Sequence, residues 1–125
     1  MTGAQGEEHA VDFLKRMGYC VIERNFRTVY GEIDIIARDG ETWVFIEVKA
    51  RSALRHDPTT TFERQTSSVN WKKRLRLSRT ALVYLSRKKI ASVPCRFDVV
   101  AIDAGKTLHV ALFRNAFEFV QPEGT

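Results

Sequence analysis

The chain has 125 residues, 44% of them hydrophobic, and carries a formal net charge of +5. This length suits one domain with one core, and the hydrophobic fraction excludes a wholly disordered chain. The basic balance allows a polyanionic partner, but many ordinary proteins are equally basic, so the position of the charges matters more than their total.

The N-terminal segment 1–7 has neither a basic region nor an apolar run, so we expect no signal peptide. No apolar run in the sequence approaches membrane-spanning length, so we expect no membrane partner. These two observations predict a cytoplasmic protein.

The first helix is predicted from about Gln5 to Met17, because apolar residues recur there at helical spacing, namely Ala10, Phe13, Leu14 and Met17. Gly18 follows in the position that commonly ends a helix. Glu7 falls on the same stripe as Ala10. Two interpretations of Glu7 stay open: an exposed carboxylate that favours the positive helix N-terminus, or one that approaches the acidic hairpin described below.

A strand is predicted from Tyr19 to about Arg27, with Cys20 near its start. The second cysteine, Cys95, falls in a later predicted strand. We expect both to be buried, reduced thiols rather than a disulfide. Because neither has a histidine nearby in the sequence, they do not predict a zinc site.

Residues 31–49 are typical of two strands joined at Asp39-Gly40, a dipeptide that readily takes the positive φ values of a tight hairpin turn. We expect Arg38 and Glu41 to flank this two-residue turn. The pairing of all other residues in the hairpin follows from that choice.

The predicted register puts Asp34 opposite Phe45 and Glu32 opposite Glu47. Since strand side chains alternate, one face carries Glu32, Asp34, Phe45, Glu47 and Lys49. The other face carries Ile33, Ile35, Val44, Ile46 and Val48, which makes it a core face. Asp34 and Glu47 become diagonal neighbours roughly 7 Å apart between Cα atoms, so their carboxylates can converge on one ion.

The polar segment 51–68 is expected to form a mobile loop. The second helix is predicted from Val69 to about Lys88, with Ser67 or Ser68 as its N-cap. Its apolar side is expected to contain Val69, Leu75, Leu77, Ala81, Leu82, Tyr84 and Leu85. For Trp71, packing in the core or at the helix end is favoured over stacking on a nucleic-acid base.

The first half of this helix is rich in cations, namely Lys72, Lys73, Arg74, Arg76 and Arg79. Such a run is usually a solvated face. Its position next to the polar segment, with almost no acids, also fits phosphate binding, and both interpretations stay open. Lys73 lies on the i, i+4 line with Leu77 and Ala81, so it should point more inward than its neighbours.

Two more strands are predicted at Pro94–Asp103 and Thr107–Phe113. The first is almost continuously apolar, which predicts burial on both faces. Asp98 within it needs a partner, for which we expect an arginine, since an unpaired buried charge is costly. Residues 114–119 are expected to dock their phenylalanines on the core, and residues 120–125 to form a loose tail.

The candidate chemistry lies in Asp34 and the segment Glu47-Val48-Lys49. Hard oxygen ligands suit Mg²⁺ or Mn²⁺, and one or two carboxylates plus a substrate phosphate is the usual Mg²⁺ arrangement. Such an ion polarises a phosphodiester and lowers the pKa of a bound water, while Lys49 can orient that water or offset charge on phosphorus. A Glu-x-Lys alone is common and also fits cross-strand ion pairing, but an aspartate on the same predicted face makes the set more specific.

The pattern Asp34…Glu47-Val48-Lys49 resembles the signature of the PD-(D/E)xK nuclease superfamily. More narrowly, the chain resembles the small YraN-like family of predicted endonucleases, which are distantly similar to archaeal Holliday junction resolvases. The residues that carry the resemblance span nearly the whole chain: Gly6-Glu7, Ala10, Leu14, Gly18-Tyr19, Asn25, Arg27, Gly31 to Ala37, Phe45 to Lys49, Arg51, Val69, Lys73, Arg96 to Val100 and Asn115 to Phe117.

The resemblance implies an α/β fold with a restriction-endonuclease-like core, in which helix, three strands, helix and two strands form a mixed sheet with flanking helices. It implies that Glu7, Asp34, Glu47 and Lys49 are the active-site positions. We expect a single nuclease-like domain over residues 1–125.

The expected function is a divalent-metal-dependent endonuclease that acts on DNA, with branched or recombination intermediates as candidate substrates. Asp34 and Glu47 are expected to hold Mg²⁺ or Mn²⁺, assisted by Glu7, while Lys49 serves the nucleophile. Phosphate contacts are expected from Arg51, Lys72, Lys73, Arg74, Arg76 and Arg79. Two alternatives stay open, a nucleic-acid-binding module that does not cut and a protein-interaction domain, and the sequence leaves open whether the chain forms a homodimer.

Overall fold

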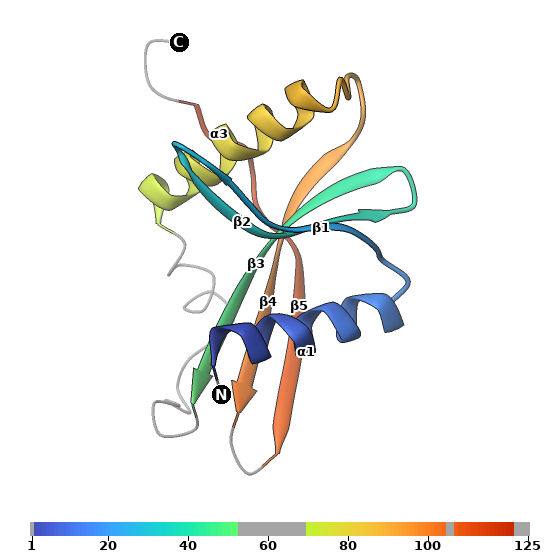
Figure 1. Cartoon of the computed structure of the whole chain (residues 1–125), viewed down its shortest axis with the longest axis vertical. Helices are drawn as coiled ribbons and strands as arrows, with labels where there is room; N and C mark the ends of the chain where they lie inside the picture. Colours follow the sequence, from blue (N-terminus) through green and yellow to red (C-terminus); the bar gives the residue numbers. More distant parts are fainter. Residues whose placement is uncertain (1, 53–69, 105–106, 122–125) are drawn as a thin grey trace.

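The structure is a computed structural model that describes residues 2–52, 70–104 and 107–121, without the side chains of 51, 52 and 104. The elements in chain order are α1 (Gly3–Arg16), β1 (Cys20–Thr28), β2 (Gly31–Asp39), β3 (Thr42–Ser52), α3 (Trp71–Arg87), β4 (Cys95–Ala104) and β5 (Leu108–Phe117) (Figure 1). The strand β3 includes the first residues of the segment expected to be a loop, and the rest of that segment lies outside the described residues. Neither of the two described helices is long and apolar enough to cross a membrane.

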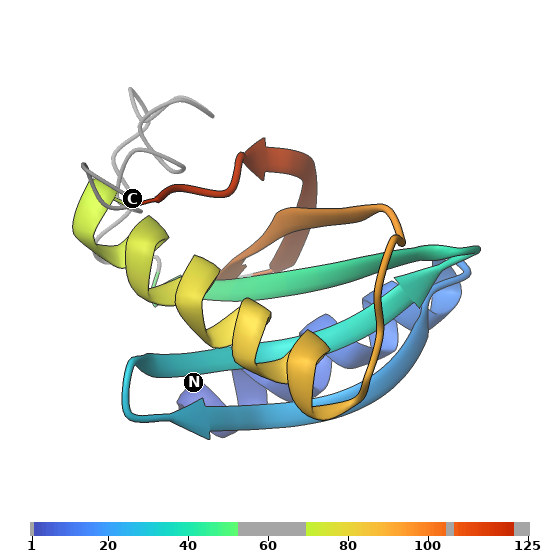
Figure 2. The ribbon, with the colours of Figure 1, turned by 90° about the horizontal axis from the view of Figure 1, so that it is seen from above.

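The strands form one five-stranded sheet in the sequential order β1-β2-β3-β4-β5. Strands β3 and β4 are parallel, and the other neighbouring pairs are antiparallel. The helix α3 connects the two parallel strands, and α1 and α3 lie on opposite faces of the sheet (Figure 2). The predicted α/β class is therefore confirmed, and the arrangement is consistent with a restriction-endonuclease-like core.

The helix α1 begins and ends with specific capping contacts. Thr2 Oγ1 accepts a hydrogen bond from the Gln5 amide (3.2 Å), and Gln5 Oε1 accepts one from the Thr2 amide (2.8 Å), which is a capping box. Gly18, with φ of 93°, ends the helix as predicted. Met17 was predicted on the core stripe, but it is the C-cap residue, beyond the last helical turn, and is 46% exposed, while Val11 is buried in its place.

The helix α3 begins later than the sequence predicted. Asn70 is the N-cap, and its Oδ1 accepts a hydrogen bond from the Lys73 amide (3.0 Å), so the prediction of a serine cap was wrong. The cap must lie directly before the first helical residue, which is Trp71. Trp71 is 50% exposed at the helix start rather than packed in the core. Leu82 is also exposed, because the buried stripe passes through Leu77, Ala81 and Tyr84.

The hairpin of β2 and β3 has its turn at Gly40-Glu41, since Asp39 pairs with Thr42 and Ile36 pairs with Phe45. The predicted register was therefore wrong by two residues, and Asp34 does not lie opposite Phe45. Because strand side chains alternate with period two, a shift of two still leaves Asp34 and Glu47 on the same side of the hairpin. Gly40 has φ of 61°, the left-handed conformation that this turn requires.

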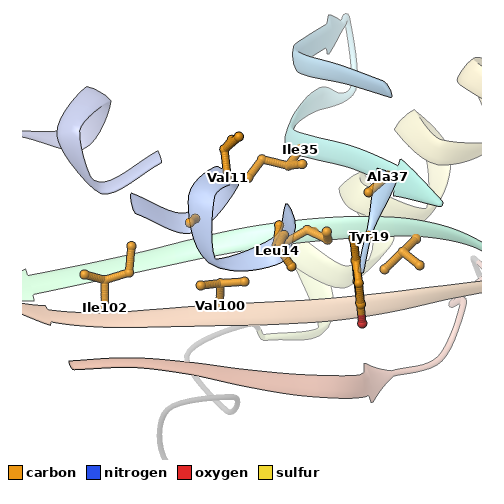
Figure 3. Packing of buried hydrophobic residues seen from close by; sticks show 10 residues of the cluster. Val11, Leu14, Tyr19, Ile35, Ala37, Val100 and Ile102 are labelled. Carbon is orange, nitrogen blue, oxygen red and sulfur yellow. The ribbon is translucent and has the colours of Figure 1, made fainter. Parts of the chain in front are cut away.

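Both faces of the sheet are buried, which the sequence analysis did not anticipate for the hairpin. The α1 side holds Ala10, Val11, Leu14, Tyr19, Ile35, Ala37, Val44, Ile46, Val100 and Ile102 (Figure 3). The α3 side holds Ile33, Ile36, Phe45, Leu77, Ala81, Tyr84, Phe97, Val99 and Phe117. Ile33 was expected on the same face as Ile35, but it packs on the α3 side. Phe45 was expected on the acidic face, and it is buried on that face beneath α3. The predicted burial of both faces of β4 is confirmed.

The strand β5 extends to Phe117, beyond the predicted end at Phe113. The Phe117 ring is buried and stacks on Phe97, with 4.6 Å between the ring centroids, so the prediction that this segment docks phenylalanines on the core is confirmed. Cys20 and Cys95 are free thiols, as expected. Their predicted burial was wrong for Cys20, which is exposed, and Cys95 is only half-buried.

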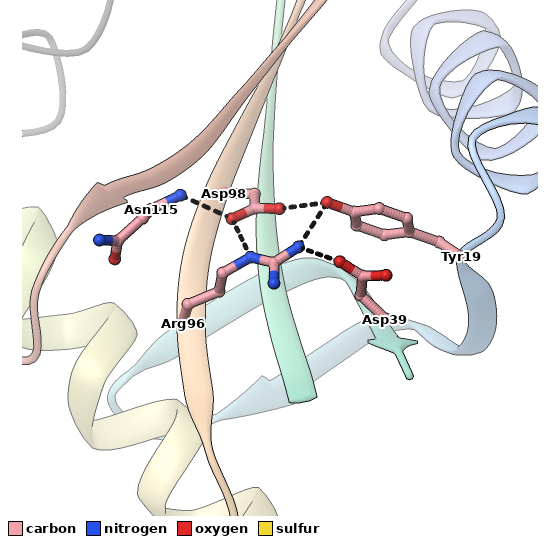
Figure 4. A network of polar contacts seen from close by, with 5 residues as sticks. All are labelled: Tyr19, Asp39, Arg96, Asp98 and Asn115. Carbon is pink, nitrogen blue, oxygen red and sulfur yellow. Dashed lines mark hydrogen bonds and ion pairs between the residues drawn. The ribbon is translucent and has the colours of Figure 1, made fainter. Parts of the chain in front are cut away.

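A polar network surrounds Asp98, which is completely buried in β4 (Figure 4). Its carboxylate accepts hydrogen bonds from Tyr19 Oη (2.8 Å), Arg96 Nε (3.0 Å) and the backbone N–H of Asn115 (2.9 Å). Arg96 also donates to Asp39 Oδ2 (2.8 Å) at the end of β2. The predicted arginine partner of Asp98 is therefore confirmed, and the network joins β2, β4, β5 and the start of β1.

Candidate active site

A cleft of about 380 Å³ opens between the hairpin and α3, and two of the predicted metal ligands line it. Its lining residues are Gly31, Glu32, Asp34, Glu47, Lys73, Arg76 and Leu77. The sheet supplies the carboxylates and α3 supplies the cations. Asp34 and Glu47 face the same space, as the alternation of the two strands predicted.

Asp34 is half-buried and lies next to the last backbone-paired residue of β2 in the pairing of β2 with β3. The regular pairing reaches Ile35 and Ile46, and Asp34 Oδ2 then accepts a hydrogen bond from the Val48 amide (2.8 Å). Burial, together with the nearby Glu47 carboxylate, raises the pKa of Asp34 to about 7. Binding a cation or a proton at neutral pH would therefore stabilise this carboxyl in its buried, negatively charged surroundings.

Glu47 is buried, and the ammonium groups of two lysines lie near its carboxylate. Lys73 Nζ of α3 lies 2.5 Å from Glu47 Oε1, and Lys49 Nζ of β3 lies 3.7 Å from the same oxygen. Burial and the neighbouring Lys73 ammonium lower the pKa of Lys49. Burial also acts to lower the pKa of Lys73, but its ion pair with Glu47 outweighs burial, so the net shift is upward.

Glu7 lies in the first half of α1 and is half-buried rather than directed into bulk solvent. Burial raises its pKa, opposed by the positive charge of Arg24. The Glu7 carboxylate also contributes to the raised pKa of Asp34. Of the two interpretations left open by spacing, the structure supports the one in which Glu7 approaches the acidic hairpin.

Asn25 and Glu32 join this group, although the sequence analysis did not assign them to the site. In the amide orientation that satisfies its hydrogen bonds, Asn25 donates to Glu32 Oε1 (2.8 Å) and to Glu7 Oε1 (2.9 Å). Asn25 has φ of 54°, a conformation that asparagine tolerates better than most residues. An asparagine inside a predicted strand was the available signal, and Glu32 already lay on the predicted acidic face.

The basic residues of α3 divide into separate groups. Lys72, Arg76 and Arg79 are exposed, whereas Lys73 turns inward to Glu47 as its position on the helix predicted. The guanidinium of Arg74 lies over the Phe117 ring, 5.4 Å from its centroid, and does not line the carboxylate cleft. The side chain of Arg51 lies outside the described part of the structure.

The donor set fits a hard divalent cation that also takes ligands from its substrate. Within residues 2–52, 70–104 and 107–121, no group of three or more His, Cys, Asp or Glu side chains is arranged to hold a metal. Asp34 and Glu47 provide two carboxylates on one cleft, which matches the usual Mg²⁺ arrangement of one or two carboxylates plus phosphate oxygens.

The raised pKa of Asp34 predicts a pH-dependent cost to stability. The carboxyl ordinarily titrates near 3.8, and folding raises its pKa to about 7, so the contribution of this group to stability is fully present below pH 4 and is lost as pH rises from 4 through 7. In metal-free buffer at pH 8, Asp34→Asn should therefore raise the free energy of unfolding by about 2 to 4 kcal/mol, and by almost nothing at pH 4. Urea denaturation in EDTA at both pH values measures this, with Asp12→Asn on the exposed face of α1 as the matched control. An Asp34→Asn protein that is less stable than wild type at pH 8 would contradict the argument.

The fold and the site together define a class: an α/β domain whose arrangement is consistent with a restriction-endonuclease-like core. Its cleft is lined by three carboxylates, one lysine and one arginine, and a second lysine, Lys49, lies near Glu47. The chain belongs to the uncharacterised protein family UPF0102, whose model matches residues 6–102. A UPF0102 protein of Thermodesulfovibrio yellowstonii is 44% identical over 115 residues, which cover 92% of this chain and 94% of the relative. One from Caldicellulosiruptor saccharolyticus is 41% identical over 118 residues, covering 92% and 95%, and one from Symbiobacterium thermophilum is 44% identical over 118 residues, covering 93% and 95%. These names state no activity, so the function has to be argued from the site.

Proposed function

We propose that this protein is a divalent-metal-dependent endonuclease that hydrolyses phosphodiester bonds in DNA, with branched or recombination intermediates as the expected substrates. One observation carries the proposal: Asp34 and Glu47 line a single cleft, and Lys49 and Lys73 bring two ammonium groups to Glu47. This combination of paired carboxylates and cations suits a phosphodiester, whose hydrolysis requires an activated water and stabilisation of added negative charge.

Asp34 and Glu47 are the residues that would hold Mg²⁺ or Mn²⁺ in this proposal. When bound, the ion supplies a Lewis acid for the phosphate and lowers the pKa of a water. The Val48 amide fixes the Asp34 carboxylate by its 2.8 Å hydrogen bond, so the ligand is oriented before substrate arrives. Glu32 lines the cleft and is linked through Asn25 to Glu7, and both carboxylates add negative charge that assists at longer range.

The two lysines have separate parts. Lys49 is in the same strand as Glu47, two positions further on, and orients the attacking water. Lys73 comes from the opposite wall of the cleft and offsets charge on the phosphate oxygens. Since Lys73 is half-buried and directed inward, its replacement should affect cleavage more than DNA binding.

The direct test is cleavage of a panel of labelled linear, flapped, forked and four-way DNA substrates with Mg²⁺ or Mn²⁺. EDTA reactions and the Asp34→Ala protein are the controls for contaminating nucleases. Metal-dependent products from wild type and none from the variant are the expected result. Products of equal yield with both proteins would contradict the proposal.

One observation favours a second candidate, a nucleic-acid-binding module that does not cut. Lys73 and Lys49 already neutralise Glu47, so this carboxylate does not require a metal for its burial to be tolerated. On this alternative, DNA binding is salt-dependent and the panel yields no metal-dependent product. For a protein-interaction domain, the remaining alternative from the sequence, salt would have little systematic effect on any nucleic-acid affinity.

The exposed arginines of α3 give a further prediction. Replacing Arg76 and Arg79 by alanine should weaken binding to all DNA sequences alike and flatten the plot of log affinity against log salt by up to about two units, since each phosphate contact contributes about 0.9. Fluorescence anisotropy across a salt series measures this on the uncleaved complex in EDTA. The double variant Lys15→Ala/Arg16→Ala removes the same charge from the end of α1 and should leave the slope unchanged. Equal slopes for all three proteins would mean that the α3 cations form only a solvated face.

A further inference from the structure

A second cleft, of about 290 Å³, lies beside the carboxylate cleft and is lined by Val29, Tyr30, Lys72, Leu75, Arg76 and Arg79. Arg76 lines both clefts, so the two are adjacent at this residue. The lining residues include three cations and no acid, whereas the first cleft contains three carboxylates. A polyanion that leaves the carboxylate cleft at Arg76 therefore meets only positive charge in the second.

The turn between β1 and β2 gives this second cleft an apolar wall. Val29 is 95% exposed and Tyr30 is 43% exposed. A single exposed apolar side chain is ordinary, but here a valine and a tyrosine are consecutive on a turn and line the same cleft as lysine and arginine side chains, which commonly bind phosphate. The Arg79 guanidinium lies 5.6 Å from the Tyr30 ring centroid, within the range of a cation–π contact.

Cations next to an aromatic ring are what a single-stranded nucleic acid requires, since its phosphates need positive charge and its bases need a surface on which to stack. A paired base in a duplex is already stacked and has no free face for Tyr30. We propose that the second cleft is a subsite for an unpaired nucleotide, in which Lys72 and Arg76 bind the phosphate and Tyr30 stacks on the base. The subsite rests on the proposed function and narrows its substrates to DNA with a single-stranded segment next to the cleaved bond.

The test compares Tyr30→Ala, Tyr30→Phe and Val29→Ser with wild type, using fluorescence anisotropy in EDTA. The probes are a labelled oligothymidine, a blunt duplex and the same duplex with a single-stranded flap. Tyr30→Ala should weaken binding of the oligothymidine and the flapped duplex by about 5- to 100-fold, the usual effect of losing one base stack, while leaving the blunt duplex within twofold. Tyr30→Phe keeps the ring and should bind like wild type.

Ile22→Ser is the matched control, since Ile22 is 43% exposed in β1 and lines neither cleft. Val29→Ser cannot disturb the core, so a smaller but selective loss with this variant supports the subsite even if Tyr30→Ala is unstable. Equal affinities for wild type, Tyr30→Ala and Val29→Ser on all three probes overturn the proposal, as does an equal loss on the blunt duplex.

The subsite and the nuclease activity can fail separately. If wild type cuts the flapped duplex and Tyr30→Ala cuts and binds it equally well, the subsite is wrong and the endonuclease stands. If Tyr30→Ala loses single-strand binding but wild type cuts nothing with Mg²⁺ or Mn²⁺, the subsite stands and the endonuclease is wrong. A wild-type protein that binds none of the three probes overturns both.

Discussion

Asp34→Asn and Glu47→Gln should each lower the rate of Mg²⁺-dependent DNA cleavage by about 10²- to 10³-fold or more, with the fold intact. Both substitutions keep the side-chain shape but remove one of the two anionic oxygen ligands that line the cleft. Loss of a single preorganised electrostatic contact in an active site typically costs this much. Single-turnover cleavage of the best substrate from the panel, with enzyme in excess, measures the chemical step directly.

Two controls separate loss of metal binding from general damage. Asp12→Asn removes an exposed carboxylate from α1 and should cleave at the wild-type rate. Isothermal titration with Mn²⁺ should give weaker binding for both site variants than for wild type. A variant that cleaves within threefold of wild type would remove that residue from the site, and unchanged metal affinity in both variants would remove the proposed metal site.

Asp98→Ala should lower the free energy of unfolding by about 3 to 5 kcal/mol, the usual cost of leaving one partner of a buried ion pair without the other. Asp98 is completely buried and accepts hydrogen bonds from Tyr19, Arg96 and the Asn115 amide. Its removal leaves the Arg96 guanidinium, itself mostly buried, with Asp39 as its remaining carboxylate partner among the residues that the structure describes. Urea denaturation at pH 7 measures the change.

The double variant Asp98→Ala/Arg96→Met tests the physical reason for this loss. If the cost comes mainly from the Arg96 guanidinium that has lost Asp98, removing it should recover much of the lost stability, because an apolar side chain carries no charge to desolvate. Asp39→Ala, at the more exposed end of the network, should cost less than Asp98→Ala. An Asp98→Ala protein within 1 kcal/mol of wild type would mean that the buried network contributes little to stability.

The sequence itself predicted on which side of their elements the main candidate site residues lie. Asp34 and Glu47 were expected on one face from alternation alone, and they line one cleft although the predicted register was off by two residues. The period of a strand explains this, since only an odd shift would have separated the two carboxylates. Lys73 was likewise expected to point inward from its helical spacing with Leu77, and it contacts Glu47.

Contacts between distant elements were decided only by the tertiary structure. The Asn25 side-chain amide donates a hydrogen bond to Glu7 because the packing of α1 and β1 brings the two residues together. No local sequence pattern predicts this contact. The same holds for turn and capping positions, where neighbouring residues have similar propensities and packing selects one of them. The hairpin turn lies at Gly40-Glu41 rather than Asp39-Gly40, and the N-cap of α3 is Asn70 rather than a serine. Periodicity determines which side of an element a residue occupies, whereas the packing of α3 and α1 on the sheet determines which residues from different elements meet in the cleft.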